Sequence, residues 1–262
     1  MKIFYRIKFI FGKINIYLRY NKKKIIPVLK WIFLGKEITN FTYEIENQDE
    51  IIHMVKAITN LEYEYLKKIL NETDPNNNDF KLFLSNDYYK DFKLKNIFGR
   101  RLLWYLLVRA VRPQIVIESG VANNLGSALL IYALYKNQCE GDNSNQYIGV
   151  DILKPSKTYF NFSKKFSRYK FFQQDSLEFL QGLSEKGKIM YISDAKHEYD
   201  FELNEYKLIK KKMLDGSIII SDNNSGSISD FSKKHNKNLL YFKEAPKNTW
   251  YHGATTGVSF FY

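Results

Sequence analysis

Short hydrophobic runs alternate with amphipathic stretches over residues 112–262 of the chain. Hydrophobic residues at helical spacing predict helices at Leu125–Leu134, Leu177–Leu183 and Glu198–Met213. This alternation predicts an α/β fold with a doubly wound, mostly parallel, seven-stranded sheet. The apolar runs that predict its strands are Ile115–Glu118, Tyr147–Val150, Tyr169–Gln173, Ile189–Ile192, Ser217–Ile220, Leu239–Phe242 and Thr256–Phe261.

The preceding part of the chain is expected to be helical. Apolar residues at helical spacing predict one helix over Ile51–Leu70 and another over Asn96–Val111, which ends before Pro113. Nearer the start, hydrophobic residues between Ile3 and Leu18 share one helical face. We therefore expect a basic amphipathic helix region at 1–36, a helical cap or substrate region at 37–108 and the α/β domain at 109–262.

The positive charge of the chain is concentrated at this N-terminal end. The net charge is +12, and residues 1–36 hold ten Lys or Arg residues and no acid, which leaves +2 for the other 226 residues. Three interpretations stay open: the region lies on an anionic membrane surface, it packs on its own domain or on a second subunit of a homo-oligomer, or it binds nucleic acid. Nucleic acid is the least favoured partner, because the nearly neutral remainder offers no matching basic surface.

The sequence favours a location in the cytoplasm or at the inner face of the membrane. A single cysteine, Cys139, excludes an internal disulfide framework and a multi-cysteine zinc site, and it fits a reducing compartment. No apolar stretch reaches the ~20 residues that a membrane-spanning helix needs. Lys8 and Lys13 interrupt the first apolar run, so this run does not resemble a signal peptide.

Acidic residues stand at the ends of five successive predicted strands. In a doubly wound sheet, ligands bind beyond the carboxyl ends of the strands. We therefore expect these acids to share the edge of the sheet at which a ligand binds. They are Glu118, Asp151, Asp175, Asp194 and Asp222.

The first strand is followed by a turn suited to close approach of a ligand. Gly120 permits a tight turn, Asn123 and Asn124 tolerate left-handed backbone geometry, and Gly126 lets the next helix begin close to a ligand. The spacing differs from the Gly-x-Gly-x-x-Gly of dinucleotide-binding proteins, and no Lys-Ser/Thr pair marks a phosphate loop. A cationic sulfonium ligand, unlike a pyrophosphate, gains from the nearby acid Glu118. A plain glycine turn is the alternative.

The segment Glu118–Gly126 resembles motif I of class I S-adenosylmethionine-dependent methyltransferases, in particular bacterial sugar and small-molecule O-methyltransferases. The resemblance covers about residues 95–262, and Asn124 stands where that family usually has glycine. It implies a Rossmann-like methyltransferase fold in which residues 109–262 form the catalytic domain. The implied donor-binding residues are Glu118, Ser119, Gly120, Asn123, Asn124, Gly126, Ser127, Asp151, Gln174, Asp175, Ser176 and Asp194.

Some of these residues have an equally good local interpretation. Asp151 offers a carboxylate for two ribose hydroxyls, and its alternative role is a helix N-cap. The resemblance implies that Gln174 to Ser176 hold the adenine edge, whereas Asp175 or Ser176 with Glu178 also forms a capping box.

The next two strand ends suggest a metal. Asp194 and Asp222 are separated by one strand–helix–strand step, and Asn223 adds an amide oxygen. Two carboxylates and an amide suit Mg²⁺, and they are similar to the metal triad of catechol-type and caffeoyl-CoA-type O-methyltransferases. Such a metal would activate and orient a bound hydroxyl. The alternative is that Asp222 and Asn223 only cap and turn the chain.

His197 follows Asp194 by three residues and resembles the family position of a general base. Lys196 is the competing candidate, and a surface histidine at a helix start is the alternative. Near the C-terminus, Trp250–Gly253 either lines an acceptor pocket or packs in the core.

The expected function is methyl transfer from S-adenosylmethionine to a hydroxyl of a sugar, glycan or other small molecule, assisted by Mg²⁺. Three alternatives stay open: a metal-independent methyltransferase, a dinucleotide-binding oxidoreductase, and a binding module that holds S-adenosylmethionine without catalysis.

Overall fold

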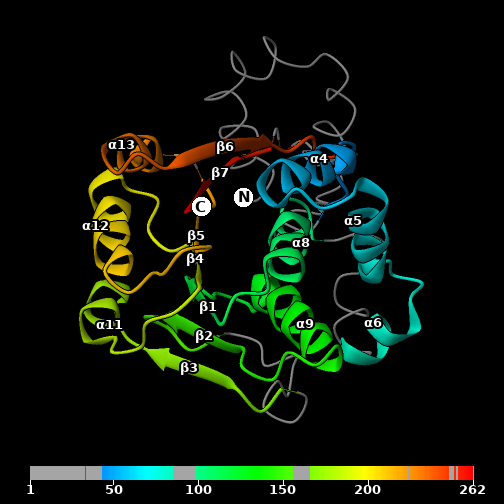
Figure 1. Ribbon diagram of the computed structural model, residues 1–262, viewed down its shortest axis with the longest axis horizontal. Helices are drawn as coiled ribbons and strands as arrows, with labels where there is room; N and C mark the ends of the chain where they lie inside the picture. The colour runs from blue at the N-terminus through cyan, green and yellow to red at the C-terminus, as the bar shows by residue number, and fades with distance from the viewer. Residues whose placement is uncertain are drawn as a thin grey trace.

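A computed structural model of the protein describes residues 33, 43–84, 98–155, 166–223, 225–247, 251 and 253–261. It confirms the doubly wound, mostly parallel, seven-stranded sheet, with strand order β3-β2-β1-β4-β5-β7-β6 (Figure 1). The strands are β1 (Ile115–Ser119), β2 (Gln146–Asp151), β3 (Tyr169–Gln173), β4 (Ile189–Ser193), β5 (Ile218–Ser221), β6 (Asn238–Lys243) and β7 (Thr255–Phe260).

The strand order creates a switch point between β1 and β4. The chain runs outward from β1 through β2 to β3, then returns to add β4 and β5 on the other side of β1. Strands β1 to β5 are parallel, whereas β7 lies antiparallel between β5 and β6. Neighbouring strands whose connections leave in opposite directions open a crevice at their carboxyl ends, where doubly wound folds bind ligands.

Helices cover both faces of the sheet (Figure 1). One layer contains α8 (Arg101–Val111) and α9 (Leu125–Cys139), and α4 (Gln48–Thr59) and α5 (Tyr63–Leu70) pack against α8. The other layer contains α11 (Ser176–Gly182), α12 (Tyr199–Lys210) and α13 (Ser227–Lys234). Two hydrophobic cores, one on each face, hold these layers to the sheet.

Several predicted elements differ in the structure. The helix expected over Ile51–Leu70 divides into α4 and α5, because Asn60 adopts a left-handed conformation with φ 57° that ends α4. Cys139 is the last residue of α9 and is exposed. Helices α6 (Asn78–Phe83) and α13 were not predicted, since their serine, asparagine and aspartate residues favour loops and caps.

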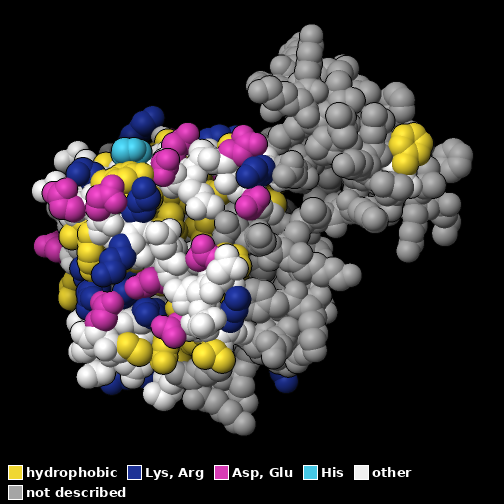
Figure 2. Space-filling model, turned by 90° about the vertical axis from the view of Figure 1, so that its right-hand side faces the viewer, with side chains coloured by type: hydrophobic (Ala, Val, Ile, Leu, Met, Phe, Trp, Pro, Cys, Tyr) yellow, Lys and Arg dark blue, Asp and Glu magenta, His cyan; other side chains and the backbone are white. Residues whose placement is uncertain are grey.

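The basic N-terminal region lies outside the described residues, apart from Phe33. Its predicted amphipathic helix and the three domain boundaries therefore stay predictions. Trp250 and His252 also lie outside the described residues. Among the described helices, none is both long and apolar enough to cross a membrane. On the face shown in Figure 2, acidic and basic side chains are interspersed over the described surface.

Candidate active site

Backbone hydrogen bonds hold four strand ends side by side. Gly120 N donates to Val150 O at 2.9 Å, Asp194 N donates to Ser119 O at 2.8 Å, and Asp222 N donates to Ser193 O at 3.1 Å. Each bond joins the first residue beyond one strand to the end of its neighbour. The structure thus brings the predicted edge residues of β2, β1, β4 and β5 together.

The turn after β1 is shaped by its contact with the β4 exit. Gly120 has φ 89°, and a Cβ atom there would lie 2.3 Å from the carbonyl oxygen of Asp194. Ala122 and Asn124 also have positive φ values, 47° and 64°. Asn124 is the residue before α9, and Asn123 Oδ1 accepts a hydrogen bond from Leu125 N at 3.3 Å. Asn124 adopts the left-handed geometry that asparagine tolerates, whereas Asn123 does not.

Glu118 lies beneath this turn. It is 1% exposed, and its Oε2 accepts hydrogen bonds from Ser127 Oγ at 2.6 Å and from the Tyr147 hydroxyl. Burial raises the pKa of Glu118 to about 7, although the bonds from Ser127 and Tyr147 oppose the rise. Gly126 is needed for this packing, since a Cβ there would lie 2.3 Å from Glu118 Oε1 and 2.5 Å from Trp104 Cζ3. The close approach at Gly126 is therefore made by protein side chains.

Asp151 fastens the end of β2 to the turn. Its Oδ2 accepts from Ala122 N at 2.9 Å, and its Oδ1 accepts from Leu153 N at 2.9 Å. An ionised carboxylate has about four acceptor sites, so both oxygens retain capacity for further donors. Asp151 is half-buried, which leaves part of it open at the ligand-binding edge.

Glu205, on α12, accepts hydrogen bonds from three serine hydroxyls beneath the same edge of the sheet. Its carboxylate accepts from Ser119 at 2.7 Å, Ser176 at 2.5 Å and Ser193 at 2.5 Å. Ser119 and Ser176, which were predicted to bind the donor, are therefore held inside the protein. Asp175 caps α11 by accepting from Leu177 N at 2.8 Å, as the alternative interpretation expected.

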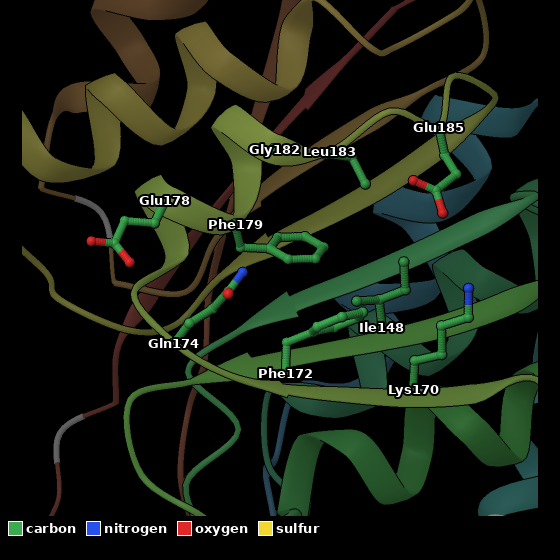
Figure 3. Close-up of a pocket in the computed structure, with 9 residues that line it drawn as sticks. All are labelled: Ile148, Lys170, Phe172, Gln174, Glu178, Phe179, Gly182, Leu183 and Glu185. Carbon is green, nitrogen blue, oxygen red and sulfur yellow. The ribbon is translucent and has the colours of Figure 1, made fainter.

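A cleft of about 290 Å³ lies between β3 and α11 (Figure 3). Gln174 lines it, with the rings of Phe172 and Phe179 beside it. None of the other predicted site residues is among its described lining residues. Gln174 thus faces the cleft, whereas the other predicted site residues at the strand ends lie outside it.

His197 lies between two carboxylates. Its Nε2 is 3.5 Å from Asp194 Oδ1, and its Nδ1 is 3.6 Å from Glu202 Oε1. Glu202 is buried on α12, where Ser225 and Ser227 donate to its other oxygen at 2.5 and 2.6 Å. By contrast, Lys196 is exposed and pairs with Glu198 at 2.8 Å. Of the two candidate bases, His197 is the one that the structure brings to Asp194.

Two of the three residues predicted to bind a metal, Asp194 and Asp222, lie close together with His197. Asp194, His197 and Asp222 have ligand atoms within 4.8 Å of one another, and Asn223 follows Asp222 in a half-buried position. However, Asp222 is fully buried, and Arg100 Nε donates to its Oδ1 at 2.7 Å while Arg100 Nη2 pairs with its Oδ2. A guanidinium therefore places a positive charge against both oxygens of a fully buried Asp222, and this arrangement does not fit a divalent cation.

The surrounding charges strengthen this conclusion. Arg101 Nη2 lies 3.7 Å from Asp194 Oδ2, so each of the two aspartates has an arginine partner. Burial opposes ionisation of Asp222, but Arg100 outweighs it and holds its pKa below the usual range. Burial and the neighbouring Asp222 raise the pKa of Asp194. The prediction of Mg²⁺ at Asp194, Asp222 and Asn223 did not anticipate these arginines.

No protein-family model matches this sequence, and no curated protein matches it. Similar solved structures include a putative O-methyltransferase from Klebsiella pneumoniae, with 10% identity over 81% of this chain and 96% of that chain and a TM-score of 0.46. An O-methyltransferase from Bacillus cereus has 11% identity over 86% and 100% of the two chains and a TM-score of 0.46. A methyltransferase from Geobacter sulfurreducens has 13% identity over 76% and 96%, with a TM-score of 0.48. Likenesses this distant assign neither an activity nor a ligand to this chain.

Four charged residues of the site were missed from the sequence: Arg100, Arg101, Glu202 and Glu205. A signal existed for the two glutamates. Helix α12 buries Glu202, Glu205, Tyr206 and Ile209, which follow the i, i+3, i+4, i+7 spacing of an inward face. An acid on such a face must have buried partners, because an unpaired buried charge is very costly.

Proposed function

We propose that this protein is an S-adenosylmethionine-dependent methyltransferase that acts on a hydroxyl group. One observation carries the proposal: at the switch point of the sheet, the Gly120–Asn124 turn, Asp151 and the Asp194–His197 segment converge on one edge. Donor-binding residues of the motif and a candidate base thus lie where this fold type binds ligands. Acids at this edge also suit a cationic ligand better than a pyrophosphate.

The chain supplies positioning at the donor side of the site. Asp151, fixed by Ala122 N and Leu153 N, is placed to accept hydrogen bonds from ribose hydroxyls. Gly120, with φ 89°, lets the turn pack directly against the β4 exit, where a Cβ would lie 2.3 Å from Asp194 O. When bound, S-adenosylmethionine supplies a methyl group on a positively charged sulfur. Such positioning of two reactants is a large part of catalysis in general.

At the acceptor side, His197 serves as the general base. Glu202 lies beside Nδ1, so it favours the tautomer that carries a proton there and leaves a lone pair on Nε2, which lies 3.5 Å from Asp194 Oδ1. The Nε2 atom takes the hydroxyl proton as the acceptor oxygen bonds to the methyl carbon. The electron pair of the broken S–C bond stays on sulfur, which becomes a neutral thioether. No step of this scheme uses a metal, because Arg100 holds Asp222.

The acceptor class follows from the motif resemblance. We propose a sugar, glycan or other small hydroxylated molecule in the cytoplasm or at the inner face of the membrane. The ten basic residues of 1–36 would then hold the enzyme at an anionic lipid surface, where glycolipid acceptors are present.

Calorimetric titration of the full chain with S-adenosylmethionine tests the proposal, with NAD⁺ as the competing ligand. We expect saturable binding of S-adenosylmethionine and none of NAD⁺. Asp151→Asn should weaken binding by roughly 10–100-fold, since hydrogen bonds to a charged group contribute about 1.5–3 kcal/mol. Asp142→Asn is the matched control, because Asp142 precedes β2 at the opposite edge of the sheet. Absence of S-adenosylmethionine binding, or NAD⁺ binding instead, would reject the proposed function.

Methyl transfer is then measured with a panel of hydroxylated sugars, glycolipids and catechols and with donor labelled in the methyl group. His197→Gln should lower turnover by about 10²–10⁴-fold while donor binding is retained. Lys196→Gln is the control for the competing base, and its turnover should match that of the wild type. The opposite result would assign the base role to Lys196.

A further inference from the structure

Arg100 stands where the sequence predicted a metal. Its Nε and Nη2 atoms meet the two oxygens of Asp222 side by side, which is the forked geometry of an arginine–carboxylate pair. Arg100 is 2% exposed and Asp222 is 0% exposed, so the pair is shielded from water. The positive charge beside Asp222 is therefore a permanent part of the fold.

The other side of the guanidinium is equally well held. Nη1 donates to Glu244 Oε1 at 3.0 Å and to the Tyr43 hydroxyl at 3.1 Å, and the Arg100 backbone N donates to Glu244 Oε2 at 3.1 Å. Glu244 also accepts from the Tyr43 hydroxyl at 2.7 Å and from Ala254 N at 2.8 Å. Arg100 is thus fixed by Tyr43, Asp222 and Glu244, which come from three separate segments of the chain.

This arrangement disfavours a divalent cation on two grounds. Arg100 and Arg101 each pair with one of the two aspartates, so a divalent cation at Asp194 and Asp222 would face two neighbouring positive charges. Mg²⁺ also keeps several of its waters in protein sites, whereas Asp222 is fully buried beneath a guanidinium that already uses both oxygens. Binding a metal at Asp222 would require Arg100 to leave a buried, hydrogen-bonded position.

We infer that Arg100 is the resident cation of this site and that the site operates without a divalent metal. That methyl transfer proceeds without a divalent metal rests on the proposed function, whereas the prediction that the site binds no divalent cation does not. Without a metal to acidify the acceptor, proton removal depends on His197 and its partner Glu202. The site would then differ chemically from the metal-dependent triad that its Asp-Asn doublet resembles.

Manganese uptake by the full chain tests the inference without relying on methyl transfer. Mn²⁺ is titrated into the wild-type protein in the absence of donor and followed by electron paramagnetic resonance. We expect no saturable uptake up to about 1 mM, the range of weak oxygen-ligand sites. Saturable uptake of one Mn²⁺ that Asp194→Asn abolishes would overturn the inference. Failure of the proposed function would appear separately, as absent binding of S-adenosylmethionine.

Removing the Arg100 guanidinium should create a divalent-cation site that the wild-type protein lacks. Arg100→Met is expected to bind Mn²⁺ at least about 100-fold more tightly than the wild type, and Mn²⁺ should raise its unfolding temperature. If this variant does not fold, the double variant Arg100→Met with Glu244→Gln is used instead. It also removes the buried Glu244 carboxylate, which loses its arginine partner when Arg100 is replaced. A folded variant that gains no Mn²⁺ affinity would contradict the role of Arg100.

Arg109→Met is the matched control for the loss of a buried arginine. Arg109 pairs with Glu72 at 2.9 Å and Glu140 at 2.5 Å, away from the strand ends. Its loss should destabilise the protein without any gain of Mn²⁺ binding, and equal gains in both variants would overturn the inference. After treatment with a chelator, the wild-type enzyme should retain full methyl transfer.

Discussion

Replacing Glu118 by Gln is expected to remove a pH dependence from the stability of this protein. Burial raises the pKa of Glu118 from an ordinary 4.5 to about 7 in the folded protein. Between these two values the folded protein holds a proton that the unfolded chain has released. The free energy of unfolding therefore falls as the pH rises through this window, because the unfolded state binds fewer protons.

The magnitude follows from the two pKa values. One pKa unit corresponds to ~1.36 kcal/mol, so the shift at Glu118 costs the folded state about 3 kcal/mol once the carboxyl is ionised. The stability that the protonated Glu118 carboxyl contributes is fully present below the unfolded pKa and is lost above about pH 7. A glutamine is neutral at every pH, and its amide oxygen can accept the same hydrogen bonds from Ser127 and Tyr147.

Chemical denaturation of both proteins between about pH 5 and about pH 8 measures the effect. The unfolding free energy of Glu118→Gln relative to the wild type should rise by about 2.5 kcal/mol across this range. Ser127→Ala removes a hydrogen bond that favours the ionised form, so it should extend the decline to higher pH. A constant difference between wild type and Glu118→Gln at all pH values would refute the reasoning.

Two further predictions test the surroundings of the site. Glu202→Gln should lower turnover by about 10–100-fold, change its pH profile and leave donor binding intact, because Glu202 positions His197; an unchanged profile would contradict that role. Gly126→Ala should lower the free energy of unfolding by about 1–3 kcal/mol, since the added Cβ meets Glu118 and Trp104. Gly182→Ala, with no atom within 4 Å of the added Cβ, is the control, and equal thermal shifts for both variants would refute the packing argument.

The sheet and its ligand-binding edge were predictable because they depend on local patterns. Each strand of the parallel sheet is a short run that ends near a polar residue, and the acids at the ends of β1, β2, β4 and β5 lie at one edge as expected. The division of the predicted helix at Asn60 was not predictable in the same way. Asparagine is tolerated inside a helix pattern, and only the packing of α4 and α5 on α8 decides where the chain turns.

The charge balance of the site could not be read from the sequence. Arg100 and Asp222 are 122 positions apart, and a basic residue at a helix start usually faces water. The acids Asp194 and Asp222 therefore predicted a metal, because the sequence does not show that Arg100 and Arg101 pair with them. The sequence motif placed Asp194 and Asp222 at the strand ends, but only the tertiary packing shows that Arg100, and not a metal, is the cation beside Asp222.

The repeated Ile-Ser-Asp sequence at the ends of β4 and β5 shows how local pattern and packing combine. Successive side chains of a strand point to opposite faces, so the serine and the following aspartate are directed differently. Ser193 bonds to Glu205 on the α12 side at 2.5 Å, whereas Asp194 and Asp222 lie near the arginines of the α8 side. Glu205 joins the β1 and β4 ends by accepting from both Ser119 and Ser193. The buried acid of α12 thus keeps two strand ends in register, and this fixes where Asp194 meets the Gly120 turn.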